Sequence, residues 1–88
     1  MYVNSVEIYF FEDEKTVSFS FCADTIEEVK DHNIEDLVVH AGQQYSMMES
    51  EVVVSSVITD HKGYVDSDEY FCTYKPPKTS RHRELATA

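Results

Sequence analysis

The chain has 88 residues, which is enough for one domain with a single modest core, and its formal net charge is −10. Residues 1–74 hold 16 of the 17 acidic residues against three lysines, whereas residues 75–88 hold four cations against one glutamate. A body this acidic repels nucleic acid and anionic membranes, so we exclude both as direct partners and expect a basic protein surface instead. The apolar share of 42% and the 11 aromatic residues exclude an acidic disordered chain.

Signals for export or membrane insertion are not found in the sequence. No apolar run approaches the roughly 18–20 residues that span a bilayer. The N-terminal residues lack the basic region and apolar stretch of a signal peptide. These observations predict a cytoplasmic protein. In that compartment Cys22 and Cys72, which both follow aromatic strand-like sequence, are expected to be reduced core thiols rather than a disulfide.

The first two predicted elements form a hairpin. Residues 6–11 alternate with a period of two and carry aromatic side chains in both phases, which predicts a strand whose two faces are both partly covered. Residues 12–15 are a polar break of hairpin length. Residues 16–22 then alternate between apolar and polar side chains, which predicts an antiparallel partner strand with one buried face.

A helix is predicted to begin after Thr25, because Thr25 and Glu28 have the spacing of a capping box. The end of this helix has two interpretations. In one, Asn33 ends a short helix and residues 37–40 form a strand; in the other, the helix continues with one apolar face until Gly42 stops it. The β-branched pair at positions 38 and 39 favours the first interpretation.

Two or three strands are predicted after the helix. Residues 52–58 form the clearest strand, and residues 60–63 form a turn whose Gly63 suits positive φ. A strand resumes at Tyr64, residues 66–69 form an exposed turn, and residues 70–74 form the last strand.

These elements predict an α+β domain over residues 1–74. Its antiparallel sheet has four to five strands, and one helix packs on one face of the sheet. Two prolines end regular structure at positions 76 and 77, and the basic tail over residues 75–88 is expected to be mobile. Exposed sheet edges could pair between chains, so a homodimer is an alternative to a monomer.

Motifs for catalysis or cofactor binding do not occur in the sequence. It has no phosphate-binding glycine loop, no G-x-S-x-G turn and no C-x-x-C or H-x-x-x-H pair. Residues 66–69 lack the spacing of a calcium loop. A zinc site would have to be assembled by the fold from the scattered residues Cys22, Cys72, His32, His40 and His61. We therefore expect a non-enzymatic protein with no cofactor and no metal.

The candidate partner-binding residues are clustered acids and nearby tyrosines. The net charge of residues 1–74 is larger in magnitude than the roughly 2–8 units that keep a small domain soluble. The alternative interpretation is that these acids only keep the protein soluble. Tyrosines are favoured anchors at protein interfaces, with acids as a polar rim, although each tyrosine could instead fill the core. The candidates are Glu27, Glu28, Asp31, Glu35, Asp36, Glu49, Glu51, Asp66, Asp68, Glu69, Tyr45, Tyr64 and Tyr70.

Two functions fit these observations. The first is an inhibitor that occupies the nucleic-acid-binding channel of a basic protein, with carboxylates standing where phosphates would stand. Small, very acidic single-domain proteins are common among phage-encoded anti-restriction and anti-CRISPR proteins, and this chain is similar to them in size and charge alone. The alternative is an interaction module, such as an immunity protein, assembly factor or regulatory subunit, that binds through a sheet face of Tyr and Met.

Overall fold

The computed structural model describes residues 1–77, which form one four-stranded antiparallel sheet and two helices. Most of the predicted mobile tail, residues 78–88, lies outside the described residues. The strands are β1 (Tyr2–Phe10), β2 (Lys15–Ala23), β3 (Ser50–Asp60) and β4 (Gly63–Tyr74). Their order across the sheet is β2-β1-β3-β4, so β2 and β4 are the edge strands. The predicted α+β class and antiparallel sheet are confirmed.

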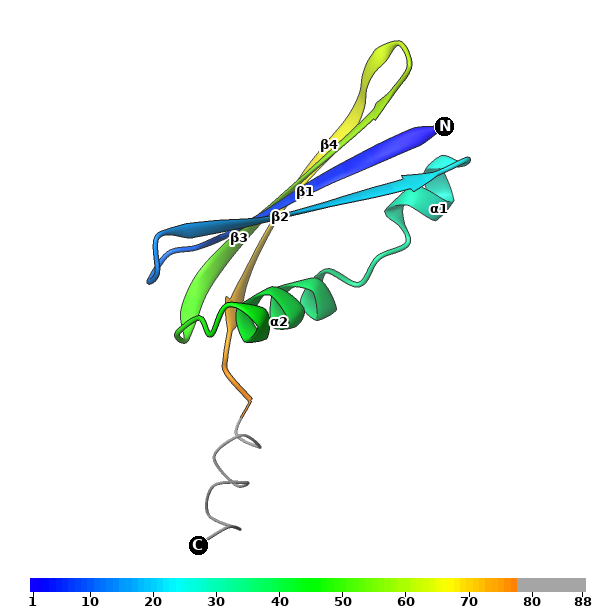
Figure 1. Cartoon of the computed structure of the whole chain (residues 1–88). Helices are drawn as coiled ribbons and strands as arrows, with labels where there is room; N and C mark the ends of the chain where they lie inside the picture. The colour runs from blue at the N-terminus through cyan, green and yellow to red at the C-terminus, as the bar shows by residue number, and fades with distance from the viewer. Residues whose placement is uncertain (78–88) are drawn as a thin grey trace, which may run out of the picture.

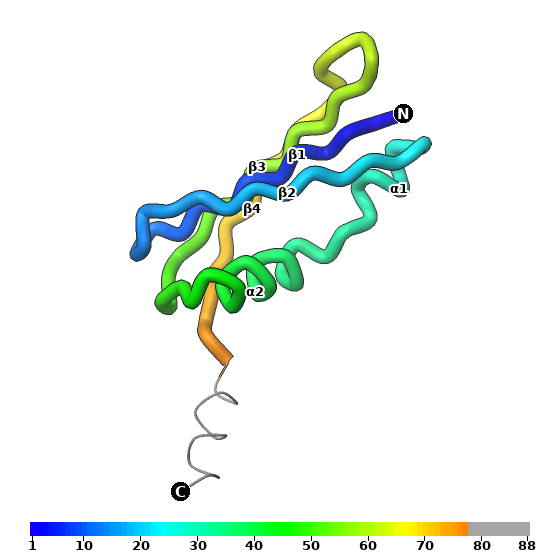
Figure 2. The backbone as a smooth tube through the Cα atoms, in the orientation of Figure 1, coloured from blue at the N-terminus to red at the C-terminus, as the bar shows by residue number. Residues whose placement is uncertain are grey.

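Both helices lie on the same side of the sheet (Figure 1). They are α1 (Ile26–Lys30) and α2 (Ile34–Gln44), and the smooth trace in Figure 2 shows that the chain passes from β2 back beneath the sheet before it enters β3. The predicted single helix is therefore replaced by two. Among the described residues no element covers the other side of the sheet, which we call the open face.

Each helix begins at a side-chain cap. The Glu28 N–H donates to Thr25 Oγ1 and the Thr25 hydroxyl donates to Glu28 Oε1, both at 3.1 Å, so the predicted capping pair is present. Asn33 was expected to end a helix, but it begins one, because its Oδ1 accepts from the Asp36 N–H at 3.2 Å.

The strand predicted over residues 37–40 is wrong, because these residues lie inside α2. An apolar stripe at helical spacing decides the outcome: Val38 and Ala41 are buried, and Leu37 packs against the same cluster. The β-branched residues at 38 and 39 oppose a helix by only a few tenths of a kcal/mol each, less than the burial of one valine side chain provides.

The core fills the space between the helices and the inner face of the sheet. Strand alternation sends Val6, Ile8 and Phe10 of β1 inward, together with Val52 and Val54 of β3. The other core residues that form this cluster are Val17, Val38, Ala41, Met47 and Tyr74. The Phe10 and Tyr74 rings meet edge to face with centroids 5.6 Å apart.

The predicted exposed turn at residues 66–69 is wrong, because these residues continue β4 without interruption. They pair with residues 55–58 of β3. The pairing of the two strands shifts register between Ile58 and Thr59, as at a β-bulge. The predicted turn before β4 is confirmed, with Gly63 at φ 118°.

Cys22 was expected in the core, and it is exposed. Alternation along β2 points Val17, Phe19 and Phe21 toward the helices and therefore points Cys22 to the open face. Cys72 is partly buried on the helix side of the opposite edge strand, and both thiols are free, as the sequence predicts.

Candidate protein-binding surfaces

The first candidate surface is a row of carboxylates along the helix side of β4, which we call the acidic margin. It consists of Asp66 and Asp68 on β4 and Glu35 and Asp36 in the first turn of α2. Alternation along β4 points Asp66 and Asp68 to the helix side, where Asp68 and Tyr70 line a small cavity. Farther along the margin, Glu35 and Asp36 line a shallow hollow with Cys72 and Thr73.

One ion pair ties the acidic margin to α1. Lys30 Nζ lies 2.8 Å from Asp66 Oδ2, and within residues 1–77 this is the one salt bridge. Hydrogen bonds from Lys30 and from the Ser67 N–H lower the pKa of the Asp66 carboxyl below its usual value. The same bond to Asp66 raises the pKa of Lys30. The other carboxylates of the margin have no cation in salt-bridge contact within this described part of the chain.

Cys72 lies beneath the α2 end of this margin. Burial raises the pKa of its thiol, and the nearby charge of Glu35 raises it further. A thiol in such surroundings is held in its protonated form, so it is poorly suited to nucleophilic catalysis. Glu35 and Cys72 line the same hollow, so the first turn of α2 lies close to β4.

The second candidate surface is an apolar cluster on the open face, which we call the aromatic patch: Tyr9, Phe11, Val53 and Phe71. Tyr9 pairs with Val53, and Val53 pairs with Phe71, so the three side chains form one row across β1, β3 and β4. The ring of Phe11 meets that of Tyr9 edge to face with centroids 5.0 Å apart. Phe71 is 73% exposed and Phe11 is 47% exposed.

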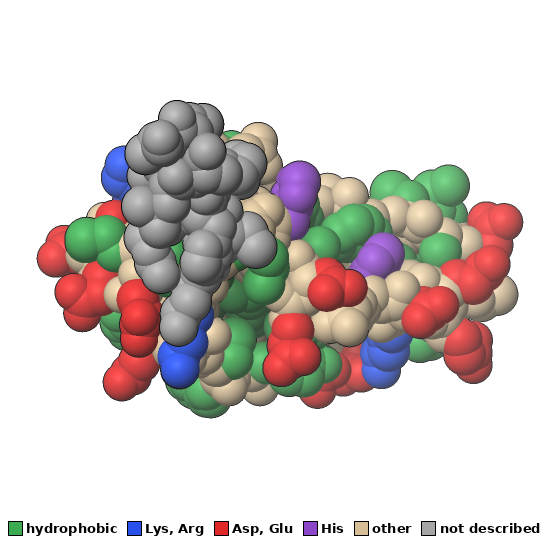
Figure 3. Space-filling model, turned by 90° about the horizontal axis from the view of Figure 1, so that it is seen from below, with side chains coloured by type: hydrophobic (Ala, Val, Ile, Leu, Met, Phe, Trp, Pro, Cys, Tyr) green, Lys and Arg blue, Asp and Glu red, His purple; other side chains and the backbone are tan. Residues whose placement is uncertain are grey.

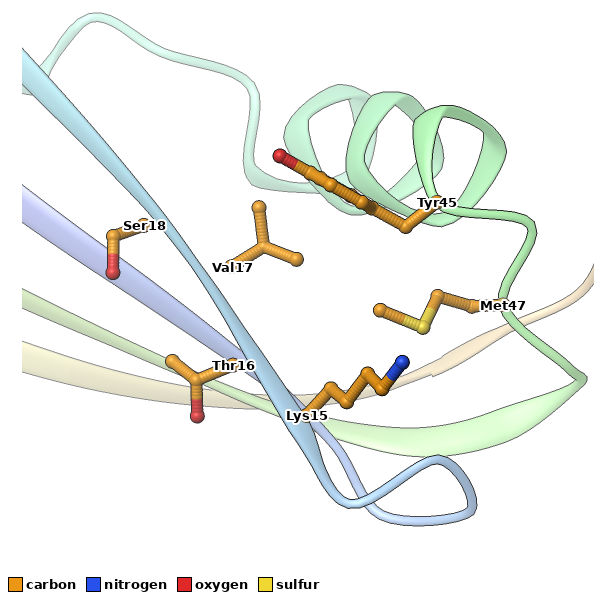
Figure 4. A pocket seen from close by; sticks show the side chains of 6 residues that line it. All are labelled: Lys15, Thr16, Val17, Ser18, Tyr45 and Met47. Atoms are coloured by element: carbon orange, nitrogen blue, oxygen red, sulfur yellow. The ribbon is translucent and has the colours of Figure 1, made fainter.

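A hollow of about 410 Å³ lies between the edge strand β2 and the end of α2 (Figure 4). Tyr45 and Met47 enter it from the helix end, and Lys15 and Val17 enter it from β2. Lys15 and the Tyr45 phenol are its titratable groups, and it contains no carboxylate, thiol or histidine.

Metal ligands do not converge anywhere in residues 1–77: no group of three His, Cys, Asp or Glu side chains lies close enough to hold an ion. Cys22 and Cys72 lie on opposite edge strands. His32 stacks on Phe21 with ring centroids 3.8 Å apart, and His40 lies 6.0 Å from the Phe19 ring, so both rings cover aromatic core residues.

The structure divides the predicted site residues into separate groups. Glu27, Glu28 and Asp31 are exposed on and just after α1, close to Lys30 and hence to the margin, whereas Glu49 and Glu51 are exposed where β3 begins. Figure 3 shows Asp and Glu side chains at several places on the face seen from below, with few Lys or Arg among them.

Strand alternation separates the expected 66–69 cluster. Asp66 and Asp68 face the helix side, whereas Glu69 pairs with Ser55 and lies on the open face.

The predicted tyrosines do not share a surface. Tyr45 caps the end of α2, Tyr64 lies near the β3–β4 turn and donates to or accepts from Ser67 at 3.0 Å, and Tyr70 faces the helix side. Sequence reasoning missed the aromatic patch instead. Its signal was available in the two-phase aromatic pattern of residues 6–11. The cover that this pattern predicted on both faces of β1 is present on the helix side only among the described residues.

Comparison with protein-family models, with curated proteins and with solved structures finds no match to this chain. Within residues 1–77 no helix is long and apolar enough to cross a membrane.

Proposed function

We propose that this protein is a non-enzymatic inhibitor that binds the basic surface of a nucleic-acid-binding or nucleic-acid-processing protein. The observation that supports this proposal is the excess of exposed, uncompensated carboxylates. Residues 1–77 carry sixteen Asp and Glu against four Lys, and one salt bridge forms among them. Such a surface accelerates encounter with a basic partner and repels competing acidic molecules.

The acidic margin suits the replacement of phosphates. Asp66 and Asp68 are two residues apart on a regular part of β4, which separates them by about 6.6 Å along the strand. Consecutive phosphates of one DNA strand rise by about 3.4 Å along the helix axis, so every second phosphate is displaced by about 6.8 Å. A groove that binds nucleic acid through Lys and Arg could therefore accept this row, although the bond to Lys30 weakens the contribution of Asp66.

Host-defence nucleases and their recognition complexes are the partner class to test first. Their channels hold many phosphate-contacting cations, and the size and charge of this chain match those of phage-encoded anti-restriction and anti-CRISPR inhibitors. An inhibitor of this kind acts by occupying the channel and needs no active site of its own.

A second candidate function is an interaction module that binds through apolar contacts. The tyrosines expected to carry it are dispersed, but the exposed Phe71 and Phe11 of the aromatic patch favour it independently. Its binding would be nearly independent of salt, whereas binding by phosphate replacement weakens as salt rises.

Capture from a bacterial lysate tests the proposed function. We expect the immobilised protein to retain nucleic-acid-binding proteins at 50 mM NaCl, and to release them to 500 mM NaCl or to competing duplex DNA. The double variant Glu35→Lys/Asp36→Lys should lower the association rate with the captured protein by about tenfold.

The variant Glu12→Lys/Glu14→Lys makes the same charge change at the β1–β2 turn and serves as the control. Equal losses in both variants would mean that net charge alone matters and that the margin has no specific role. Captured proteins that resist both salt and duplex DNA would contradict the inhibitor proposal and favour the interaction module.

A further inference from the structure

The aromatic patch lies at one end of a sheet face whose other side chains are mostly polar, with Val57 and Tyr64 as exposed exceptions. Beyond the row of Tyr9, Val53 and Phe71, the next row of the open face contains Glu7, Ser55 and Glu69, and the row after it contains Ser5, Val57 and Ser67. A sheet face in contact with solvent normally carries polar side chains. An exposed apolar cluster rimmed by polar residues is typical of an interaction site. The patch is therefore a defined feature and not part of a uniformly apolar face.

Carboxylates flank the patch on both sides along the strand direction. Glu7 and Glu69 lie in the row on one side, and Glu51 lies on the other side, where its carbonyl accepts from the Phe11 N–H at 3.1 Å. All three side chains are exposed. Among the described strand residues that point to the open face, none is Lys, Arg or His.

We propose that the open face is the surface on which the partner docks, and that the partner presents there an apolar segment flanked by Arg or Lys. This inference rests on the proposed function and specifies which face acts and what chemistry it recognises. Apolar side chains would cover Phe71 and Phe11, and cations would meet Glu7, Glu51 and Glu69 at the rim. The acidic margin lies on the helix side of the same edge strand, β4, so cations of the partner can reach it around that edge.

Charge distinguishes this occupant from a second copy of the chain. Two open faces packed together would bring Glu7, Glu51 and Glu69 of one copy against the same residues of the other, with no cation from either face's strands. Like charges placed opposite one another in an interface oppose its formation. A basic partner turns the same carboxylates into favourable contacts.

Phe71 is expected to be the main anchor of the interface. It is the most exposed phenylalanine of the described chain, and it lies in one row with Val53 and Tyr9, which are both partly buried. Large aromatic side chains at the centre of an interface carry most of its binding energy, and their truncation lowers affinity by tenfold or more. Because Phe71 is exposed, its removal should leave the core unchanged.

A peptide that alternates Leu and Arg provides a probe of defined chemistry. We expect its titration at 150 mM NaCl to perturb the amide NMR signals around residues 9, 53 and 71. Phe71→Ala should weaken binding about tenfold, and Glu69→Lys should weaken it as well. A peptide of equal charge that alternates Ser and Arg should bind at least tenfold more weakly, because it lacks the apolar component.

Tyr64→Ala is the matched control, since Tyr64 is 68% exposed on the same strand but lies outside the patch. Unchanged affinity in Phe71→Ala, equal binding of the two peptides, or perturbations confined to the helix side would each overturn the docking inference. A dimer of the wild-type protein in sedimentation equilibrium that Phe71→Ala dissociates would also overturn it, because a second copy would then occupy the face.

Lysate capture with the same variants separates this inference from the proposed function. If the duplex-DNA-sensitive partners bind Phe71→Ala as well as the wild type, the docking inference fails and the proposed function stands. If no captured protein responds to duplex DNA while the Leu and Arg peptide still maps to the patch, the proposed function fails. In that case the open face remains a docking surface for an apolar, basic segment of a different class of protein.

Discussion

At the scale of single residues, one buried polar link attaches α1 to the sheet. Asn4 Nδ2 donates to the Val29 carbonyl at 3.0 Å, and Asn4 Oδ1 accepts from the Ser56 hydroxyl at 2.7 Å. Asn4 and Ser56 are both buried on the inner face of the sheet. Each would be costly there without a partner, and among the described residues no buried side-chain polar atom lacks one.

Gly42 gives a residue-scale prediction. A Cβ added at this position would overlap the ring of Tyr74, which is 2% exposed and packed against Phe10. We expect Gly42→Ala to lower the free energy of unfolding by about 1–3 kcal/mol through overpacking, despite the better helix propensity of alanine. Urea denaturation measures the change.

The double-mutant cycle with Tyr74→Leu is the control for this prediction, because a smaller side chain removes the overlap. In the Tyr74→Leu background, Gly42→Ala should destabilise the protein far less. A stabilising Gly42→Ala in the wild-type background would show that helix propensity dominates and that α2 can move away from the sheet.

At the scale of elements, the acids of β4 have a structural consequence. β4 is a 12-residue edge strand whose outer backbone groups have no strand partner among the described residues. Asp66, Asp68 and Glu69 follow one another along it. Charges on an edge strand oppose pairing with a second edge, so the same residues that form a candidate binding surface also protect the strand from edge-to-edge association.

The Lys30–Asp66 pair joins α1 to β4 and predicts a pH dependence. The pKa of Asp66 is lowered in the folded protein, so its contribution to stability is present above the unfolded carboxyl pKa and is lost as pH falls through the folded value. The pKa of Lys30 is raised, so its contribution is present below the unfolded amine pKa and is lost as pH rises through the folded value. Between these limits the pair is intact.

Carboxyl ¹³C NMR titration tests the pair directly. We expect the Asp66 signal to titrate below the usual range of aspartate, and to move toward that range in Lys30→Ala or in 1 M NaCl. Lys62→Ala removes the same charge from the β3–β4 turn and should leave the Asp66 titration nearly unchanged. An Asp66 titration that does not respond to Lys30→Ala would mean that the pair does not form in solution.

At the scale of the whole molecule, uncompensated charge opposes folding. The carboxylates of residues 1–77 lie on both faces of the sheet and repel one another, and salt screens that repulsion. We expect the midpoint of urea unfolding to rise as NaCl increases from 20 mM to 300 mM.

A variant with Glu12, Glu14, Glu27 and Glu35 replaced by glutamine is the matched comparison for the salt experiment. It keeps similar side-chain volume and removes four charges, so its midpoint should be higher at 20 mM NaCl and should respond less to salt. A wild-type midpoint that falls with salt would indicate that favourable charge pairs outweigh the repulsion.

The sequence by itself determined the strands β1, β2 and β3, the turn at Gly63, the helix start at Thr25 and the acidic character. These features depend on local chemistry: alternation of side chains, the hydrogen bond of a capping residue, and formal charge. None of them requires knowledge of a distant neighbour.

The tertiary structure alone decided the rest. Residues 37–40 became helical because burial of Val38 and Ala41 on the sheet outweighs weak local preference, a contribution that appears only when the sheet exists. The pairing of β4 with β3 sent Asp66 and Asp68 to one face and Glu69 to the other. Cross-strand register likewise brought Tyr9, Val53 and Phe71 into one row, because sheet neighbours are set by pairing and are distant in the sequence.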